Sequence, residues 1–254
     1  MSDRLNTASA TSSQKAAEVR PYGRFGKKEE VAEMFNNIAH RYDFLNHTLS
    51  MGIDRGWRKK AIRKMAAINP ERILDVATGT ADLALEALSL QPEKVIGVDI
   101  SEAMLAKGRE KVADRNLSDV VELRYGDSEA LEFEDNSFDA AMVAYGVRNF
   151  ENLGKGLTEI NRVLRPGGIL VVLEFSRPRK FPIRPLYDTY FRVILPRIGR
   201  LVSKDTRAYS YLYESVSVFP DGEAFEQELT KAGFQFTTCE RLSFGITSIY
   251  TGIA

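Results

Sequence analysis

Residues that commonly bind metals or carry redox chemistry are scarce in this chain of 254 residues. It contains one cysteine, Cys239, and two histidines, His40 and His47. A single thiol cannot form an internal disulfide, so we expect a reducing, cytoplasmic compartment and a packing role for Cys239. So few sulfur and imidazole ligands also predict that the chain has no metal site.

Long apolar runs and an excess of one charge are missing as well. No apolar run reaches the roughly 18 residues of a transmembrane helix, so the sequence predicts none. Lys and Arg together number 35, as do Asp and Glu, and this balance argues against a dedicated nucleic-acid-binding protein. Residues 1–17 are rich in Ser, Thr and Ala, and we expect a disordered tail over 1–25 rather than a signal peptide.

The chain does contain a regular alternation of apolar strands and helical segments. Strands are expected at 72–77, 94–99, 120–125, 138–144 and 169–175, and helices at 80–90, from about 101, and at 152–164. This alternation predicts an α/β fold with a doubly wound, mostly parallel sheet. A helix at 221–232 precedes two last strands, near 234–242 and 246–253, which we expect to pair as an antiparallel hairpin at the sheet edge.

Two further segments complete the predicted organisation. Residues 26–66 are expected to form a helical cap, because apolar residues follow helical spacing at Val31, Met34, Phe35, Ile38 and Tyr42. The main domain is expected over 67–254. Its segment 177–218 carries four prolines among aromatic residues and arginines, and is a candidate lid.

The turn after the first strand points to a nucleoside ligand. Asp99 ends the second strand 20 residues after Gly79, where a carboxylate can bind a ribose diol. The turn has one glycine instead of G-x-G-x-x-G, and Asp75 and Asp82 would repel a pyrophosphate, which argues against a dehydrogenase. Acids suit a cationic or zwitterionic ligand such as S-adenosylmethionine. An ordinary turn in a protein that binds its ligand elsewhere is the alternative.

Longer motifs resemble the ubiquinone/menaquinone biosynthesis C-methyltransferases. YDFLN at 42–46, SMGI at 50–53 and WRK at 57–59 resemble one family signature, and RVLRPGG at 162–168 with EFS at 174–176 resembles the second. GVRN at 146–149 and LPRIG at 195–199 are similar to other family segments. The resemblance covers about residues 30–254. The chain departs from the family pattern at Leu45, commonly Met, at Asp54, commonly His, and at Ala81, commonly Gly.

The resemblance implies a fold and a reaction. The expected fold is that of the class I S-adenosylmethionine-dependent methyltransferases, a seven-stranded, mostly parallel sheet with helices on both faces. The expected reaction is C-methylation of a prenylated quinol, demethylmenaquinol first and 2-methoxy-6-polyprenyl-1,4-benzoquinol second. A methyltransferase of the same fold acting on a soluble small molecule, and a non-catalytic scaffold of a quinone-synthesis complex, are the alternatives.

The expected cofactor site lies at the ends of the strands. By the resemblance, Thr80, Asp99, Asp127 and Ser128 line it. The full expected set of S-adenosylmethionine-binding residues is Asp75, Gly79, Thr80, Asp99, Asp127, Ser128 and Ala144. For Asp127 the alternative is a helix or turn cap.

The expected catalytic residues are Arg148, Asn149, Tyr42 and Asp43. Arg148 and Asn149 follow the fourth strand at its carboxyl end, where open α/β sheets bind ligands. Arg148 is expected to hold a phenolate, or a water that takes its proton, because an arginine is not itself a base. Tyr42 and Asp43 are expected to cover the cofactor and contact substrate, with Asp43 as a candidate base. A loop-closing salt bridge for Arg148, and helix-end packing for Tyr42 and Asp43, are the alternatives.

The candidate lid and its charge suggest what else the site contacts. Glu174 and Ser176 are expected to support the site, and Tyr187, Tyr190, Phe191 and Tyr209 to form a slot for a ring and its prenyl tail, or simply to pack the lid. Residues 177–207 hold nine Lys or Arg against two Asp or Glu, and residues 55–64 add six more basic side chains. We expect peripheral contact with an anionic membrane; a solvated face, or an interface in a homodimer, is the alternative.

Overall fold

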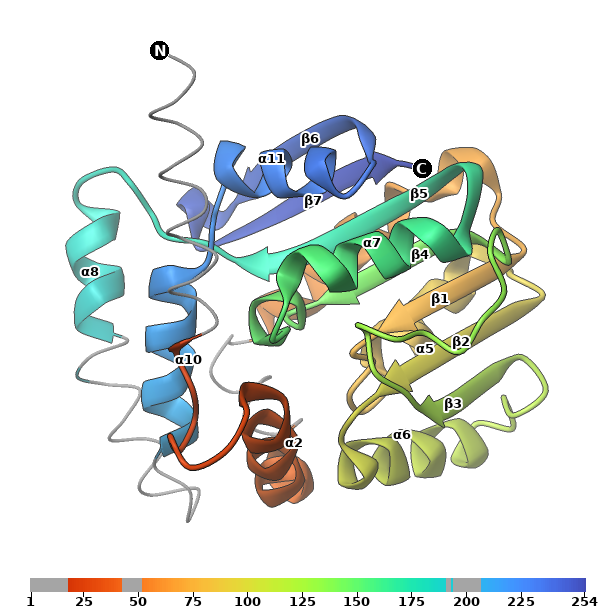
Figure 1. Cartoon of the computed structure of the whole chain (residues 1–254), viewed down its shortest axis with the longest axis horizontal. Helices are drawn as coiled ribbons and strands as arrows, with labels where there is room; N and C mark the ends of the chain where they lie inside the picture. The colour runs from red at the N-terminus through yellow and green to blue at the C-terminus, as the bar shows by residue number, and fades with distance from the viewer. Residues whose placement is uncertain (1–17, 43–51, 191–192, 194–206) are drawn as a thin grey trace.

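The computed structural model describes residues 18–42, 52–190, 193 and 207–254, without the side chains of Arg41 and Tyr209. Seven strands form one sheet in the order β3-β2-β1-β4-β5-β7-β6 (Figure 1). Their bounds are β1 Arg72–Val76, β2 Lys94–Asp99, β3 Val121–Tyr125, β4 Phe138–Ala144, β5 Leu164–Phe175, β6 Gln235–Leu242 and β7 Thr247–Ile253. Strands β1 to β5 pair in parallel, and β7 pairs antiparallel with both β5 and β6. The predicted class I methyltransferase sheet with its antiparallel C-terminal pair is confirmed.

Helices cover both faces of this sheet. Their bounds are α2 Lys27–Ile38, α4 Ile53–Arg63, α5 Asp82–Ala87, α6 Glu102–Asp114, α7 Leu153–Val163, α8 Ile183–Thr189, α10 Arg207–Val218 and α11 Glu223–Lys231. Buried side chains of α7 and α11, such as Leu157 and Phe225, pack on one face with Leu74 and Val143. Those of α4, α5 and α6 pack with Ile73 and other residues on the second face. No helix in the described ranges is long and apolar enough to cross a membrane.

The fifth strand is longer than predicted. The sequence predicts a strand over 169–175, but β5 already begins at Leu164, and its register against β4 shifts between Phe138 and Ala140. Gly167 has φ +81°, and a Cβ at Gly168 would lie 2.8 Å from the carbonyl oxygen of Arg165. Gly167 and Gly168 therefore form an irregularity inside the strand, with a backbone that only glycine adopts without strain.

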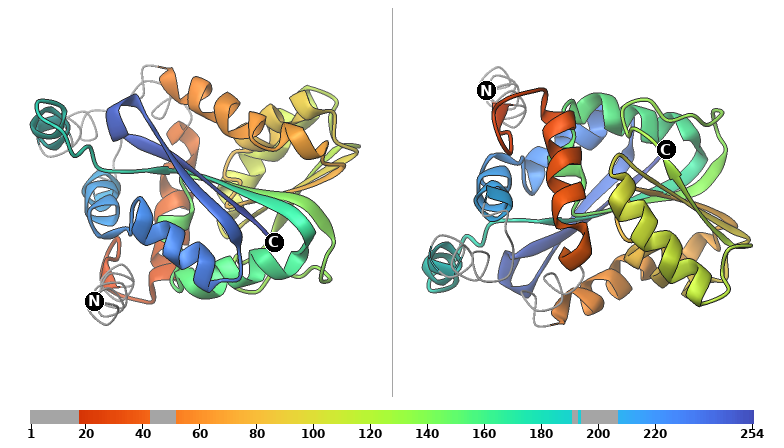
Figure 2. Two further views of the ribbon diagram at one scale, coloured as in Figure 1. Left: turned by 90° about the horizontal axis from the view of Figure 1, so that it is seen from above. Right: turned by 90° about the horizontal axis from the view of Figure 1, so that it is seen from below.

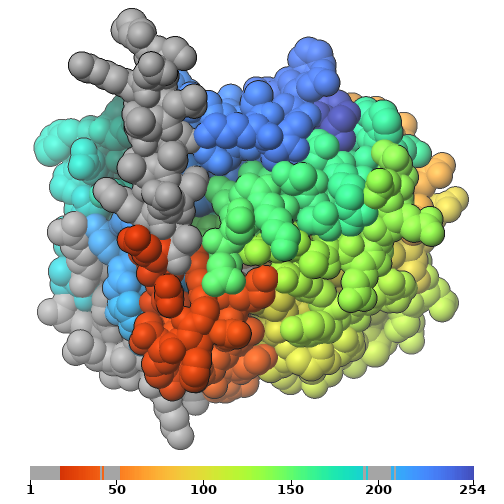
Figure 3. Space-filling view, viewed as in Figure 1, coloured from red at the N-terminus to blue at the C-terminus, as the bar shows by residue number. Residues whose placement is uncertain are grey.

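The predicted helical cap over 26–66 is divided between two places. Helix α4 packs on the sheet through Trp57, Ala61 and Ile62. Helix α2 instead lies between α6 and α10, at the end of the sheet to which the parallel strands point, as the two views of Figure 2 show. Figure 3 shows residues 18–42 (red) filling this space beside α10 (blue). The carboxyl ends of the parallel strands are thus covered by α2.

The chain just before α2 is held by one buried carboxylate. Glu30 is fully buried, and it accepts backbone N–H bonds from Tyr22 at 2.6 Å, Gly23 at 2.7 Å and Phe25 at 2.6 Å, and another from Arg24. Disorder is predicted over 1–25, whereas residues 18–25 take this defined course; residues 1–17 lie outside the described ranges. Glu30 orders these residues by accepting their backbone N–H groups. The sequence pattern did not predict this, because a charged residue of a helix is expected to face solvent.

Candidate cofactor and catalytic site

A cavity opens where β1, β2, β3 and β4 end beneath α2. Each strand contributes the residues that immediately follow it, as the Rossmann-like topology requires. The residues around the cavity include Lys28, Val31, Phe35, Tyr42, Gly79, Asp99, Met104, Asp127, Ser128, Ala144, Tyr145 and Asn149.

Asp99 lies at the rim between the ends of β1 and β2. Its Oδ2 accepts the backbone N–H of Gly79 at 2.8 Å, and its Oδ1 accepts that of Ser101 at 2.8 Å. Burial raises the pKa of Asp99 to about 6, against the lowering effect of these backbone donors. A carboxylate has about four acceptor positions, so Asp99 keeps capacity for a ribose diol.

The turn between Val76 and Asp82 has an unusual backbone. Ala77, Gly79 and Ala81 all have positive φ, at +56°, +55° and +66°. Ala81 has a Cβ, so its left-handed conformation costs about 1–2 kcal/mol. The turn nevertheless brings backbone at Gly79 to the cavity wall.

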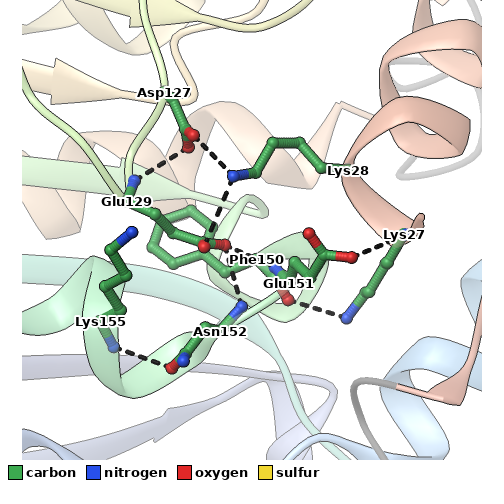
Figure 4. A network of polar contacts seen from close by, with 8 residues as sticks. All are labelled: Lys27, Lys28, Asp127, Glu129, Phe150, Glu151, Asn152 and Lys155. Atoms are coloured by element: carbon green, nitrogen blue, oxygen red, sulfur yellow. Dashed lines mark hydrogen bonds and ion pairs between the residues drawn. The ribbon is translucent and has the colours of Figure 1, made fainter.

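Asp127 follows β3, and its two carboxylate oxygens have different partners. Its Oδ1 accepts the backbone N–H of Glu129 at 2.9 Å, so the turn-cap alternative holds for this oxygen. Its Oδ2 lies 2.6 Å from Nζ of Lys28, which also lies 3.5 Å from Oε2 of Glu129 (Figure 4). Partial burial alone would lower the pKa of Lys28, but the two carboxylates raise it. Asp127 and Ser128 both line the cavity, and Ala144 lies opposite at the end of β4.

Two predicted cofactor residues do not line the cavity. Asp75 is buried within β1, where its Oδ2 accepts a hydrogen bond from the hydroxyl of Thr78 at 2.7 Å and its Oδ1 has no partner among the described residues. Burial raises the pKa of Asp75 to about 7. Thr80 is also buried, and its hydroxyl accepts a hydrogen bond from Nζ of Lys111 at 3.0 Å instead of facing the ligand. Both side chains therefore bond to neighbouring protein groups and do not line the cavity.

The short 3₁₀ helix after β4, Val147–Asn149, carries the predicted catalytic pair. Arg148 is buried, and its Nη1 donates to Oε1 of Glu174 at 2.9 Å and to the carbonyl of Tyr145. The predicted salt-bridge alternative is thus present, and Glu174 is the partner. Burial raises the pKa of Glu174, although Arg148 opposes this shift. Asn149 lines the cavity, whereas Arg148 lies beside it.

The other predicted site residues lie in different places. Tyr42 lines the cavity and its ring lies 5.9 Å from that of Phe35 in an edge-to-face arrangement. Ser176 turns away, since its hydroxyl bonds the carbonyl of Gly245 at 2.9 Å. Tyr187 is buried, at the end of α8. Asp43 and Phe191, and the side chain of Tyr209, lie outside the described residues.

Four residues near the site were not singled out from the sequence. Lys27 and Lys28 extend from α2, and Tyr211 from α10 donates its hydroxyl to Oδ1 of Asn149 at 3.1 Å. Tyr145 follows β4 with φ +57°, an uncommon backbone conformation for an aromatic residue, and lines the cavity. The sequence carries a signal for one of these four residues, Lys27, because its spacing places it on the same buried face of α2 as Val31, Met34 and Ile38.

Comparison with known proteins agrees with this geometry. Residues 24–254 match the ubiE/COQ5 methyltransferase family. A demethylmenaquinone methyltransferase from Bacteroides fragilis is 49% identical over 92% of this chain and 96% of its own length. A ubiquinone/menaquinone biosynthesis C-methyltransferase from Geobacter sulfurreducens is 44% identical over 89% of each chain. An S-adenosylmethionine-dependent methyltransferase structure from Thermotoga maritima has a TM-score of 0.60 at 20% identity, covering 87% of this chain and 98% of its own.

Proposed function

The chain belongs to the ubiE/COQ5 methyltransferase family, and from this premise we propose that it methylates a ring carbon of demethylmenaquinol, using S-adenosylmethionine, to give menaquinol. The observation that carries this proposal is the juxtaposition of two sets of residues. Asp99 and Asp127 line a cavity suited to a nucleoside, and the Arg148–Glu174 pair lies beside it at the ends of β4 and β5.

The cavity fits S-adenosylmethionine by the polar side chains around it, Asp99, Asp127 and Ser128. When bound, this cofactor supplies a methyl group made electrophilic by a sulfonium. Asp99 would accept the ribose hydroxyls, and Asp127 with Ser128 would hold the adenine end. Acidic side chains at this rim suit the positive charge of the ligand and oppose a pyrophosphate.

The reaction requires activation of the acceptor. A C–S bond breaks, a C–C bond forms at the ring, and the ring carbon gives up its proton, so S-adenosylhomocysteine and a methylated quinol result. Removal of a phenolic proton first makes the ring carbon nucleophilic, and assisted proton transfer contributes roughly 10²–10⁴-fold. We assign Arg148 to hold the phenolate or the water that takes its proton, Asn149 and Tyr42 to contact the substrate, and Asp43 as a candidate base.

We prefer the naphthoquinol as substrate because of the relatives that this chain resembles. The relative from Bacteroides fragilis, named for demethylmenaquinone, is more similar to this chain than the relative from Geobacter sulfurreducens, whose name includes both quinones. The benzoquinol 2-methoxy-6-polyprenyl-1,4-benzoquinol is the second candidate. The retained Asp99, Asp127 and Arg148 favour an active enzyme over a scaffold.

We also propose reversible membrane contact at the edge formed by α8 and the β6–β7 turn. Exposed apolar side chains occur there, with Phe181 87%, Leu186 64% and Phe244 81% exposed. The carbonyl of Gly245 accepts the hydroxyl of Ser176, so the turn lies next to the chain that leads into α8. Arg177, Arg179, Lys180 and Arg184 add positive charge suited to anionic headgroups. Cosedimentation with anionic vesicles at low salt, but not with neutral ones, is the expected result; pelleting no greater than with neutral vesicles would overturn this proposal.

The proposed activity is tested by product mass spectrometry. Purified protein is incubated under reducing conditions with methyl-labelled S-adenosylmethionine and either demethylmenaquinol or 2-methoxy-6-polyprenyl-1,4-benzoquinol. Label on the ring carbon of the naphthoquinol alone supports the proposal, and label on both quinols means a dual substrate range. Absence of transfer to either, with cofactor binding demonstrated by calorimetry, would overturn it in favour of a soluble substrate.

A further inference from the structure

The first turn of α2 inserts a buried ammonium beneath the loop that carries Arg148 and Asn149. Lys27 is only 2% exposed, and its Nζ donates to the carbonyl of Arg148 at 3.0 Å. It also donates to the carbonyl of Phe150 at 2.9 Å, as Figure 4 shows. These carbonyls lie at the end of the 3₁₀ helix Val147–Asn149, where backbone oxygens lack helical donors. Lys27 therefore satisfies them from another element, 121 residues away in sequence.

Two carboxylates bind backbone N–H groups at the start of α2 and in the chain that follows the 3₁₀ helix. The backbone N–H of Lys27 donates to Oε1 of Glu151 at 3.0 Å, at the N-terminus of α2 where a negative charge is stabilising. Oε1 of Glu129 accepts the backbone N–H groups of Glu151 and Asn152, both at 2.9 Å. Glu151 and Glu129 also balance the repulsion between Lys27 and the nearby Arg148.

The neighbouring lysine connects this network to the cofactor side of the cavity. Nζ of Lys28 bridges Asp127 and Glu129, so consecutive residues of α2 contact both the end of β3 and the loop after β4. Two further elements hold the loop itself. Tyr211 of α10 bonds the amide of Asn149, and Glu174 of β5 binds Arg148. Three elements, α2, α10 and β5, thus hold the loop.

We propose that Lys27 is a positioning residue for methyl transfer, which fixes the Arg148–Asn149 loop in its productive arrangement when α2 covers the cavity. The proposal rests on the proposed function of that loop. Lys27 itself does not line the cavity, so it acts through the backbone of Arg148 and Phe150. A displacement of about 1 Å in a positioning group can cost on the order of 10²-fold in rate.

The test compares Lys27→Met, which keeps the side-chain length but removes the donor, with Lys27→Arg and with Lys107→Met as a matched control. Lys107 is exposed on α6 and pairs only locally, with Glu110 at 2.7 Å. We expect Lys27→Met to lower kcat by about 10- to 100-fold while the Kd for S-adenosylhomocysteine stays within about threefold. Hydrogen exchange should accelerate in peptides covering 146–152 and remain unchanged in β1 and β5. Lys27→Arg should recover part of kcat, and Lys107→Met should behave as the unmodified protein.

Two results would overturn the proposal. One is a Lys27→Met variant whose kcat and loop exchange both stay within about twofold of the unmodified protein. The other is a uniform rise in exchange with parallel loss of cofactor binding, which would mean a general role in stability. If the unmodified protein methylates neither quinol, the proposed substrate fails separately, and exchange in 146–152 with the cofactor Kd still decides whether Lys27 fixes the loop.

Discussion

Arg148 and Glu174 form a buried ion pair that joins the end of β4 to the end of β5, with Nη1 and Oε1 at 2.9 Å. The two side chains are 8% and 0% exposed, so neither charge can be solvated if the other is lost. Oε2 of Glu174 also accepts the backbone N–H of Arg148 at 3.4 Å. This arrangement fixes the guanidinium beside the cavity and ties its position to a single carboxylate.

We therefore expect Glu174→Gln to impair both activity and stability. Loss of one partner from a buried pair costs about 3–5 kcal/mol, because the remaining charge is uncompensated. Misorientation of Arg148 should lower kcat by about 10²-fold. Arg148→Met should lower kcat at least as much, and the double variant should be no worse than Arg148→Met, since the two residues act as a unit.

Steady-state kinetics and urea unfolding measure these effects. Glu122→Gln is the matched control, because it disrupts an exposed ion pair with Arg124. It should change the free energy of unfolding by less than about 1 kcal/mol. Additive losses of kcat in the double variant would contradict a shared role for Arg148 and Glu174.

Asp99 gives a prediction about cofactor affinity and pH. Its pKa is raised to about 6, so protonation removes the charged acceptor as the pH falls through 6. We expect the Kd for S-adenosylmethionine to rise between pH 7 and pH 5. Asp99→Asn should weaken binding by about 10- to 100-fold at pH 7, the loss of hydrogen bonds to a charged group.

Titration calorimetry at pH 5, 6, 7 and 8 checks this dependence. In Asp99→Asn the affinity should be nearly constant over the range, while the exposed-site control Asp119→Asn should reproduce the curve of the unmodified protein. A pH dependence that survives in Asp99→Asn would assign the titration to another group, with Asp75 as the first candidate because its pKa is raised to about 7.

The sheet and the acids at its rim were predictable because their signals are local. An acid at the end of a strand, as Asp99, or just after it, as Asp127, is placed at the sheet edge whatever the rest of the chain does. The orientation of Thr80 was not predictable, because it depends on Lys111, which α6 brings to the turn. Lys27 shares the apolar stripe of α2, but a lysine there is expected to extend into solvent. Its burial depends on carbonyls 121 residues away in sequence.

Glu30 gives a stability prediction with a definite pH window. Four backbone donors from the preceding loop hold its pKa down at about 2, despite burial, which acts in the opposite direction. A carboxyl with a depressed pKa contributes stability above its ordinary value of 4.5, and this contribution is lost as the pH falls from 4.5 toward 2. Glu30→Gln should therefore lower the free energy of unfolding at pH 7 by about 2–3 kcal/mol.

Urea midpoints at pH 7, 5 and 3 separate this effect from others. The difference between the unmodified protein and Glu30→Gln should be constant from pH 7 to 5 and smaller at pH 3. Glu33→Gln, which alters a carboxylate 42% exposed and paired with Arg24, is the control and should have little effect. An equal deficit of Glu30→Gln at all three pH values would mean that the lost contribution does not come from the ionised carboxylate.

Lys27 gives a stability prediction of the same sign at alkaline pH. Burial, with the nearby charge of Arg148, lowers its pKa from 10.5 to about 8, so the folded protein releases this proton before the unfolded chain does. Between pH 8 and 10.5 the unfolded state binds more protons, and linkage then requires that the free energy of unfolding attributable to Lys27 rises with pH, by up to about 3 kcal/mol. The stability of Lys27→Met, relative to the unmodified protein, should accordingly fall across this window. Paired denaturant titrations at pH 7.5, 9 and 10.5 cancel the other titrating groups, since both proteins carry them. A relative stability that stays flat would show that the pKa of Lys27 is not lowered in the folded protein.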